Sequence, residues 1–292
     1  MAADAAPGDG LGHLSRSSAL AAVLRRRGAE VRAIGLGAPE RIERDGIPWE
    51  PGDLSALGHP DVLVLDSYRT PPAAAAEWAG RTALVAFHDQ GDLVAGAALS
   101  ISTVRDEPGP GVVGGLDYAP VQPGFRERAR PPADDVSWVL VTTGGTDPGG
   151  VGAAVAADLA ADFERVSLVR GPHAEDSVPP GVEPIRGGSL LDPITGCDLV
   201  VTAAGVTLLE ACAAGTPAVA LVVAGNQRPG AERLARAGAI CLVDPPDAER
   251  AAQAARELAA DPRRRHELSQ RARNLVDGRG LERIAERIEA LS

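Results

Sequence analysis

The sequence predicts an α/β protein built from two doubly wound parallel sheets that face each other across a cleft. Short apolar runs alternate with longer helical patterns along the chain, which is typical of βαβ units and a parallel sheet. A polar, proline-rich stretch at 126–135 interrupts the alternation and is interpreted as a linker. The chain has 292 residues, enough for two domains, which we place at 1–128 and 136–292.

In the first half, apolar runs predict strands at 30–34, 61–65, 82–87 and 98–102. The clearest helix spans 14–27, with Leu20, Val23 and Leu24 on one face. Residues 2–7 read AADAAP and lack the character of a central strand. The first strand of this domain is therefore predicted to be missing, and the natural start to lie about six to eight residues upstream, one strand's length.

The second half restarts the alternation with Val-rich strands. These are predicted at 137–142, 165–169, 198–202, 218–223 and 239–243. Helices are predicted at 150–161, 207–214, 231–237 and 247–259. The Arg- and Glu-rich residues 262–291 have helical spacing and are assigned to the second domain as its tail.

Composition excludes several classes of function. All 29 basic residues are Arg, so lysine-dependent chemistry such as Schiff-base formation is ruled out. A net charge of −11 and 3% aromatics argue against nucleic acid as a partner. The three cysteines lie in apolar runs and predict reduced thiols in a cytoplasmic protein. We expect no stable membrane insertion because no run approaches ~18 apolar residues, and the oligomeric state stays open.

Ligands bind at the carboxyl ends of strands in open parallel sheets, so the loops that follow strands are the candidate binding sites. The opening loop contains Gly10, Gly12 and His13, where glycines permit close backbone approach and a helix begins. An imidazole at such a junction is able to act as a general base near neutral pH. The alternative is a capping or exposed histidine.

In the second domain, Gly144 and Gly145 follow the first strong strand, and their amides suit phosphate contact. Asp147, just before Pro148, is interpreted as a helix N-cap.

A later strand leads into a turn with Gly205 and Thr207, which opens a helix whose N-terminus suits a diphosphate. Glu210 is either a ligand of ribose hydroxyls or an acid that complements the helix dipole. Asn226 and Gln227 follow the next strand and suit sugar or phosphate contacts, with a helix N-cap at Asn226 as the alternative.

A further polar group follows two first-domain strands: Asp66 to Arg69, then His88, Asp89 and Asp92. These residues show no spacing typical of metal ligands, so we predict a polar wall of the cleft, no metal and no cofactor.

Several of these motifs occur together and in order. They are GxGHxxR, DSY, LDYAPVQPGF, TGGTDP, AAGVTLLEACAAGTPAV and an Asn-Gln pair. The set resembles the sugar-nucleotide hydrolases of the pseudaminic acid pathway and their spore-coat polysaccharide relatives. These are similar in turn to the lipid-linked N-acetylglucosaminyl transferases of cell-wall synthesis. The resemblance extends to about Val243, although family members begin with an apolar strand and often carry paired aspartates where this chain has His88 and Asp89.

The resemblance implies a GT-B fold that binds a UDP-sugar without a metal. His13 is expected to activate water for attack at the anomeric carbon, releasing UDP and an inverted sugar. Gly10, Gly12, Arg16 and Tyr68 are expected on the sugar side.

In the second domain the resemblance implies a site for the nucleotide. Gly144, Gly145, Gly205 and Thr207 are expected at the diphosphate, and Glu210 at the ribose. Asn226 and Gln227 are expected to face sugar and phosphates.

Two alternatives remain beside the hydrolase. A GT-B glycosyltransferase would pass the sugar from the same donor site to an acceptor hydroxyl. A protein that binds a nucleotide sugar without catalysis would use the same loops for binding only. No apolar or basic patch for a lipid-linked acceptor is evident in the first half of the sequence, which favours hydrolysis or a soluble acceptor.

Overall fold

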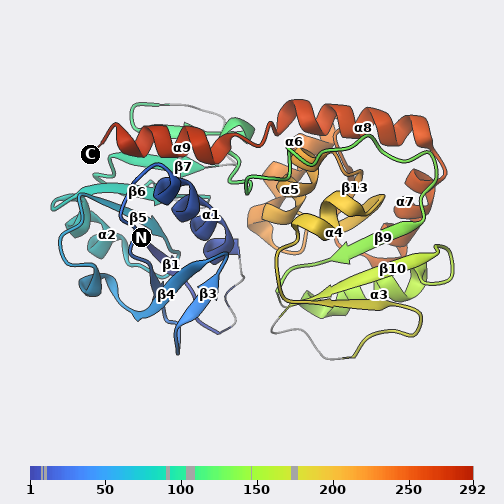
Figure 1. The fold of residues 1–292 in the computed structure, drawn as a ribbon, viewed down its shortest axis with the longest axis horizontal. Coiled ribbons are helices and arrows are strands. Elements are labelled where there is room, and N and C mark those ends of the chain that lie inside the picture. Colours follow the sequence, from blue (N-terminus) through green and yellow to red (C-terminus); the bar gives the residue numbers. More distant parts are fainter. Residues whose placement is uncertain are drawn as a thin grey trace. The chain divides into compact units, whose positions relative to one another are not determined.

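The computed structural model describes residues 1–7, 9, 12–89, 93–102, 109–145, 147–171 and 177–291. The chain divides into two compact units. Unit 1 comprises Met1–Gln122 with Arg279–Ser292, and unit 2 comprises Pro123–Gly278. Each unit is an α/β structure around its own sheet (Figure 1).

Unit 1 contains an eight-stranded sheet in the order β3-β4-β2-β1-β5-β6-β7-β8. All neighbours are parallel except the β3–β4 hairpin. Its strands are β1 Ala2–Asp4, β2 Ile34–Leu36, β3 Ile42–Arg44, β4 Ile47–Gly52, β5 Val62–Asp66, β6 Ala83–Phe87, β7 Leu99–Ser102 and β8 Val112–Gly114. Its helices are α1 Gly12–Arg26, α2 Pro72–Ala79 and α9 Gly280–Glu289, with 3-10 turns η1 Leu54–Leu57 and η2 Leu116–Tyr118.

Alternate residues of the strands pack into two hydrophobic cores in unit 1. Val64 and Val85 pack in one cluster with the apolar faces of α1 and α9. Leu63 and Leu84 pack in another with η1 and α2. Because successive side chains of a strand point to opposite faces, the sheet is covered on both sides, as an open parallel sheet requires.

Strand β1 corrects the prediction that the first strand is missing. Residues 2–4 pair in parallel with β2 on one side and with β5 on the other. Ala2 and Ala3 are fully buried, at 1% and 0% exposure. Alanine has a low strand propensity, but pairing on both edges and burial on both faces override it.

Unit 2 contains a six-stranded parallel sheet in the order β11-β10-β9-β12-β13-β14. Its strands are β9 Trp138–Thr142, β10 Arg165–Arg170, β11 Glu183–Arg186, β12 Leu199–Ala203, β13 Ala218–Leu221 and β14 Cys241–Val243. Its helices are α3 Val151–Leu159, α4 Leu191–Gly196, α5 Val206–Ala214, α6 Arg228–Arg236, α7 Ala248–Ala259 and α8 Pro262–Leu275, with 3-10 turns η3 Pro148–Gly150 and η4 Gly225–Gln227.

The predicted strands of the second half all form, with ends shifted by one or two residues. In the first half the strand predicted at 30–34 forms only at its last residue, as β2. The short strands β3, β4, β8 and β11 were not predicted. They are stabilised by pairing with neighbouring strands rather than by a pattern of their own.

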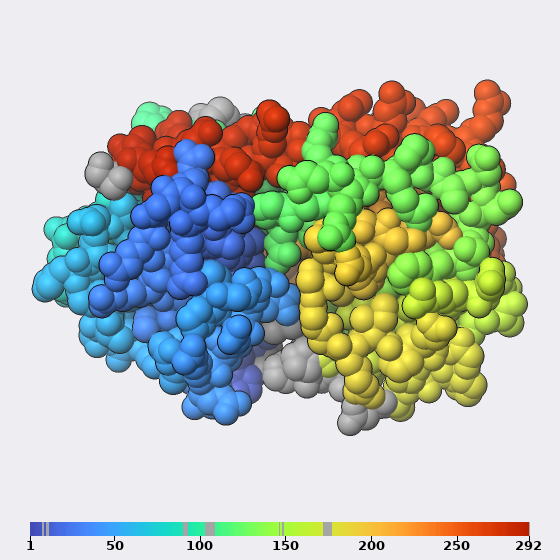
Figure 2. Space-filling view, in the orientation of Figure 1, coloured from blue at the N-terminus to red at the C-terminus, as the bar shows by residue number. Residues whose placement is uncertain are grey.

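The predicted tail divides between the units. Helix α8 belongs to unit 2, but α9 belongs to unit 1, so its assignment to the second domain was wrong. Leu281, Ile284 and Ile288 are buried in the same cluster as α1, and Arg27 pairs with Glu289 at 2.6 Å. In Figure 2 the red atoms of this helix cover the blue atoms of unit 1. Helical spacing in the sequence does not tell which core an apolar face will join.

The predicted linker at 126–135 is likewise packed onto unit 2. Arg130 donates to the carbonyl oxygens of Gly196 and Cys197 at 2.7 and 2.9 Å. Arg265 is fully buried and donates to the carbonyl oxygen of Ala133 at 2.9 Å. The chain therefore first passes from unit 1 to unit 2 between Gln122 and Pro123, ahead of residues 126–135.

Within the described ranges, no helix is long and apolar enough to cross a membrane. The three cysteines are unpaired, as predicted. Burial raises the pKa of the Cys197 and Cys212 thiols to about 12.

Candidate active site

The described part of unit 1 gathers polar side chains at the carboxyl ends of three neighbouring strands. Asp4 ends β1, Asp66 ends β5, and Asp89 follows β6 by two residues. His13 is the second residue of α1, the helix that follows β1. We call His13, Arg16, Asp66, Tyr68 and Asp89 the His13 cluster.

The histidine is held by a buried carboxylate. His13 Nδ1 lies 2.6 Å from Asp66 Oδ1, and Asp66 is completely buried. An ionised carboxylate only accepts, so Nδ1 carries the proton. The neutral ring therefore keeps its lone pair on Nε2, the arrangement of a general base oriented by an acid.

Arg16 explains how Asp66 stays ionised in the core. Its Nε and Nη2 each donate to Asp66 at 2.6 Å, and Nη1 donates to Asp89. Ser17 Oγ adds a bond to Asp66 at 3.0 Å. Burial alone would raise the pKa of Asp66, but the Arg16 charge and the bonds from Arg16 and His13 lower it to about 2.

Arg16 is predicted to contact the substrate, which stays a prediction, and in the structure its guanidinium pairs with Asp66 and Asp89. The residue is 7% exposed, and its guanidinium lies 4.7 Å from the centroid of the Phe87 ring. It is the counter-ion of Asp66 and Asp89. Gly12 is exposed beside His13, whereas Gly10 lies outside the described residues.

Tyr68 lies beside the histidine, and its place on the sugar side stays a prediction. Its ring meets the His13 ring edge-on, with centroids 4.7 Å apart and planes at 83°. Its hydroxyl lies 3.4 Å from Asp89 Oδ2, and 45% of the residue is exposed. An exposed aromatic ring next to a histidine suits contact with a sugar face.

Stability at low pH should depend on Asp66. Its pKa is lower folded, at about 2, than the ordinary 3.8, so its stabilisation is full above about pH 4 and is lost as the pH falls towards 2. The expected loss is roughly 2 kcal/mol. Urea unfolding of the wild type and of Asp66→Asn at pH 2, 3, 4 and 6 checks this: the variant should lack that part of the pH dependence. An equal dependence in both proteins would contradict it.

Sequence reasoning placed Asp66 and Asp89 in a polar wall but did not pair either with a partner. Both carboxylates lie at the carboxyl ends of neighbouring strands, β5 and β6, and only β5 lies beside β1. Asp92, named with them, lies outside the described residues. Among the residues that the structure describes, no three His, Cys, Asp or Glu side chains are grouped as metal ligands would be.

In unit 2 the predicted loops leave the same edge of the sheet. Strand β12 lies between β9 and β13, and all three are parallel. The glycine loop after β9, the Gly205 turn after β12 and the Asn226–Gln227 turn after β13 therefore start side by side. Parallel strands with adjacent carboxyl ends are where open sheets bind ligands.

Asp147 is a helix cap, as predicted. Its Oδ1 accepts from the Gly152 amide at 2.7 Å and from Thr143 Oγ1 at 2.6 Å, and its Oδ2 accepts from the Ala153 amide at 3.1 Å. The helix that it caps is α3, which begins directly after η3. Asp147 thus occupies amides of the first turn of α3.

The glycine loop closely approaches the chain after β10. A Cβ atom on Gly171 would lie 2.2 Å from the Gly145 carbonyl oxygen. Gly144 has φ +95°, a region that favours glycine, and a Cβ there would meet nothing within 4 Å. Gly144 is thus constrained by its conformation, whereas the close contact constrains Gly171, whose Cβ position lies against the backbone of Gly145.

Gly171→Ala is therefore expected to displace this loop and to lower the free energy of unfolding by about 1–3 kcal/mol. Gly80→Ala is the control, because that glycine has φ −76° and its Cβ would lie 3.4 Å from the nearest atom. Thermal unfolding of both variants checks the prediction. Equal melting temperatures for the two would contradict it.

Gln227 joins the turns after β12 and β13. Its Oε1 accepts from the Val223 amide at 3.0 Å, and its Nε2 would lie 3.6 Å from a Cβ atom on Gly205. The expected contact of Gln227 with a ligand is thus accompanied by a structural bond. Asn226 is half-buried inside η4, so it is not the N-cap considered as an alternative.

Helix α5 begins at Val206, one residue before the start predicted from the sequence. Gly205 is the N-cap residue and Thr207 is half-buried in the first turn. Glu210 is 6% exposed and lies just beyond the first turn. The interaction of an acid with the helix dipole falls off within the first turn, so that alternative is disfavoured.

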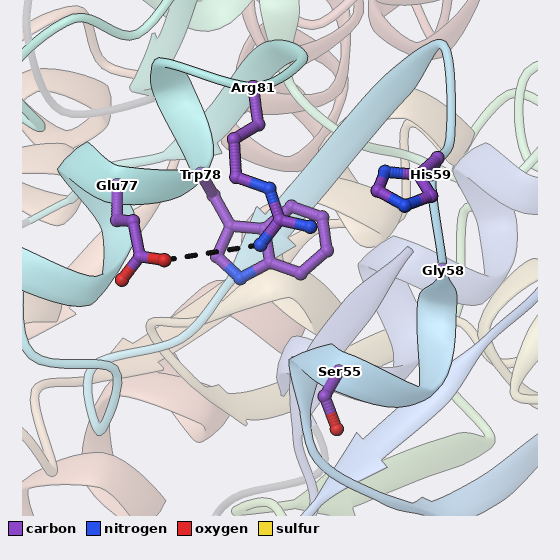
Figure 3. Close-up of a pocket in the computed structure, with 6 residues that line it drawn as sticks. All are labelled: Ser55, Gly58, His59, Glu77, Trp78 and Arg81. Atoms are coloured by element: carbon purple, nitrogen blue, oxygen red, sulfur yellow. Dashed lines mark ion pairs between the residues drawn. The ribbon is translucent and has the colours of Figure 1, made fainter.

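The described surface also has a pocket of about 320 Å³ elsewhere in unit 1. Figure 3 shows Arg81 lying across the ring of Trp78, with Glu77 and His59 nearby. The Arg81 guanidinium is 4.6 Å from the ring centroid and 4.0 Å from Glu77. The pocket shares no residue with the His13 cluster, and its polar side chains are exposed. We assign it no role in the chemistry.

Comparisons with known proteins agree on the fold. Residues 193–275, less than a third of the chain, match the family model described as glycosyl transferases group 1. No match was found among curated proteins. MurG of Acinetobacter baumannii is 14% identical, with 99% of this chain and 98% of that chain covered at a TM-score of 0.62.

Two further solved structures are similar. The glycotransferase of kitacinnamycin is 19% identical, with 99% and 98% covered at a TM-score of 0.65. SsfS6 of Streptomyces sp. SF2575, complexed with thymidine diphosphate, is 18% identical, with 81% and 71% covered at a TM-score of 0.56. None of these comparisons singles out the hydrolases that the motifs resemble. The chain has the GT-B fold, with two Rossmann-like units.

Proposed function

We propose that this protein is a glycosyltransferase that moves a sugar from a nucleoside diphosphate to an acceptor hydroxyl. The observation that carries the proposal is the His13–Asp66 pair at 2.6 Å, in which a buried carboxylate holds the Nδ1 side of the imidazole ring. In an inverting transfer, the acceptor hydroxyl loses its proton to His13 Nε2 as its oxygen attacks the anomeric carbon. The sugar–phosphate bond breaks on the opposite face, and the electron pair leaves with the diphosphate.

The loops of unit 2 are proposed to bind the nucleotide. Backbone amides of Gly144, Gly145 and the α5 N-terminus stabilise the charge that develops on the leaving diphosphate. Arg170, buried at the end of β10 with Nη1 3.9 Å from Asp147, adds a positive charge near this loop. Glu210 is proposed at the ribose, and Asn226 at the sugar or phosphate.

Two features support transfer as the reaction. The family match at 193–275 covers α5, β13 and the Asn226–Gln227 turn, and it is a match to transferases. The solved structure of SsfS6 holds thymidine diphosphate, so we propose a uridine or thymidine diphosphate donor. A cytoplasmic location remains a prediction from the cysteines.

Hydrolysis is the second candidate, because the order of the motifs in the sequence resembles that of sugar-nucleotide hydrolases. It is the same reaction with water in place of the acceptor hydroxyl, and the same base serves it. The two differ only in what His13 deprotonates.

The test incubates the protein with UDP- and TDP-sugars and follows free nucleotide and free sugar, with and without acceptors. Nucleotide release that requires an acceptor supports transfer, and release of nucleotide with free sugar in its absence supports hydrolysis. Binding is read separately: a diphosphate at 100 times its Kd should stabilise the fold by about 2.7 kcal/mol. AMP serves as the control. If neither UDP nor TDP raises the melting temperature above the value measured with AMP, the proposed donor site is wrong.

A further inference from the structure

The last residue of β1, Asp4, makes contacts that the reaction described above does not use. Its side chain is buried, with the residue 3% exposed. Oδ1 accepts from Ser67 Oγ at 2.6 Å, and Oδ2 accepts from the Tyr68 amide at 2.7 Å and the Arg69 amide at 3.3 Å. One carboxylate thus collects three donors from the turn that follows β5. Hydrogen bonds to an ionised acceptor are stronger than neutral ones.

A second carboxylate holds the same turn from the other side. Arg69 donates to Asp9 through Nη2 at 2.7 Å and through Nε at 3.0 Å. Asp9 also accepts from the Ala6 amide at 2.9 Å. Within the turn, Ser67 Oγ accepts from the Thr70 amide at 2.9 Å. The described parts of segments 4–9 and 67–70 are therefore tied together at two points.

The turn carries Tyr68, whose ring stands edge-on against His13. The ring of His13 is thus contacted by two residues: Asp66 lies at Nδ1, and the ring of Tyr68 makes a T-shaped contact with it. Asp66 is fixed by Arg16 and Ser17 in the core. Tyr68 is half exposed, its hydroxyl lies 3.4 Å from Asp89 Oδ2, and Asp4 holds its backbone amide.

We propose that Asp4 is a positioning residue that keeps the Tyr68 ring against His13. The backbone bond fixes where the Tyr68 Cα lies, and the two side-chain torsions of tyrosine then leave few positions for the ring. The catalytic consequence rests on the proposed function, in which His13 is the base. Asn at position 4 offers only one oxygen acceptor and turns an NH₂ group towards a donor, so the turn loses part of its anchor.

The first experiment reads the contact without any substrate. Imidazole proton resonances are recorded in histidine-labelled protein, with His13 assigned by its disappearance in His13→Gln. Because a neighbouring aromatic ring shifts such resonances, Tyr68→Leu defines their position without the ring. In Asp4→Asn they should move from the wild-type position towards the Tyr68→Leu position.

A matched control comes from unit 2. Asp198 is also buried, at 9% exposure, and accepts from Ser137 Oγ and from the amides of Ser137 and Trp138 at 3.0–3.1 Å. Asp198→Asn therefore perturbs a similar set of bonds, together with an ion pair to Arg130, in the other unit. It should leave the His13 resonances at their wild-type positions. Ser67→Ala removes one Asp4 bond by a milder change and serves if Asp4→Asn does not fold.

The second experiment measures turnover with the donor that the wild type uses. Asp4→Asn should lower kcat roughly 10- to 100-fold, as expected for a misplaced catalytic group, and should change the KM for the sugar donor less. Asp198→Asn should keep kcat near the wild-type value at a similar loss of melting temperature. A purely structural role would lower activity in both variants in proportion to their stability.

Unmoved His13 resonances in both Asp4→Asn and Ser67→Ala would overturn the proposal, whatever the reaction is. So would resonances that move while kcat stays at the wild-type value. If the wild type turns over no nucleotide sugar at all, the proposed function fails. The resonances alone then decide whether Asp4 positions Tyr68.

Discussion

Asp66→Ala is expected to lower the free energy of unfolding by about 3–5 kcal/mol, because it removes one partner of a buried ion pair. Arg16 places two of its nitrogens on Asp66 at 2.6 Å, and both side chains are buried. Without that carboxylate, Arg16 keeps Asp89 as its counter-ion among the described residues, and Ser17 Oγ loses this acceptor. Urea unfolding followed by circular dichroism measures the loss.

The control for this prediction is Asp192→Ala. Asp192 also pairs with an arginine, Arg128, but its side chain is 85% exposed. Surface pairs contribute about 0–1 kcal/mol, so this variant should unfold near the wild-type urea concentration. A loss of stability in Asp66→Ala no larger than in Asp192→Ala would show that the buried pair is not what stabilises this end of the sheet.

His13→Ala is expected to reduce turnover by roughly 10²–10⁴-fold, the usual contribution of a general base. The imidazole is the group that we propose takes the proton, and Asp66 holds its Nδ1 side at 2.6 Å. Its loss should cost little stability relative to Asp66→Ala, since Asp66 keeps its bonds from Arg16 and Ser17. Initial rates at saturating donor, with melting temperatures alongside, separate the two effects.

His59→Ala is the matched control, since His59 is exposed in the surface pocket of unit 1. It should turn over at the wild-type rate. The double variant of His13→Ala with Asp66→Asn should be about as slow as His13→Ala alone, because residues that act as one unit do not add. Full turnover in His13→Ala would show that His13 is not the base.

Much of this fold could be predicted because its signals are local. The Val-rich runs of the second half became strands β9, β10, β12, β13 and β14 within one or two residues. A run of that kind is buried on both faces of a parallel sheet, and it therefore shows in the sequence itself. The capping role of Asp147 was equally predictable, since the amides that its carboxylate accepts from lie within six positions along the chain.

The candidate site was only half predictable. The sequence indicated His13 and Tyr68, and the structure brings their rings to 4.7 Å. It also indicated Arg16, but as a substrate contact rather than as the counter-ion of Asp66. Which carboxylate meets the histidine depends on β5 lying next to β1, and strand order is not written in any local pattern.

What the sequence determined by itself is the α/β class, the loops that follow its strands and the reliance on Arg, amides and helix ends for positive charge. Only the tertiary structure decided which sheet or which unit is joined by a segment whose local sequence signal is weak or ambiguous. Residues 2–4 became the central strand β1 because β2 and β5 pair with both edges. Helix α9 joined unit 1 because its apolar face fills the core beside α1. In both cases the stabilising contacts come from residues distant in the chain, and local propensity is too weak to oppose them.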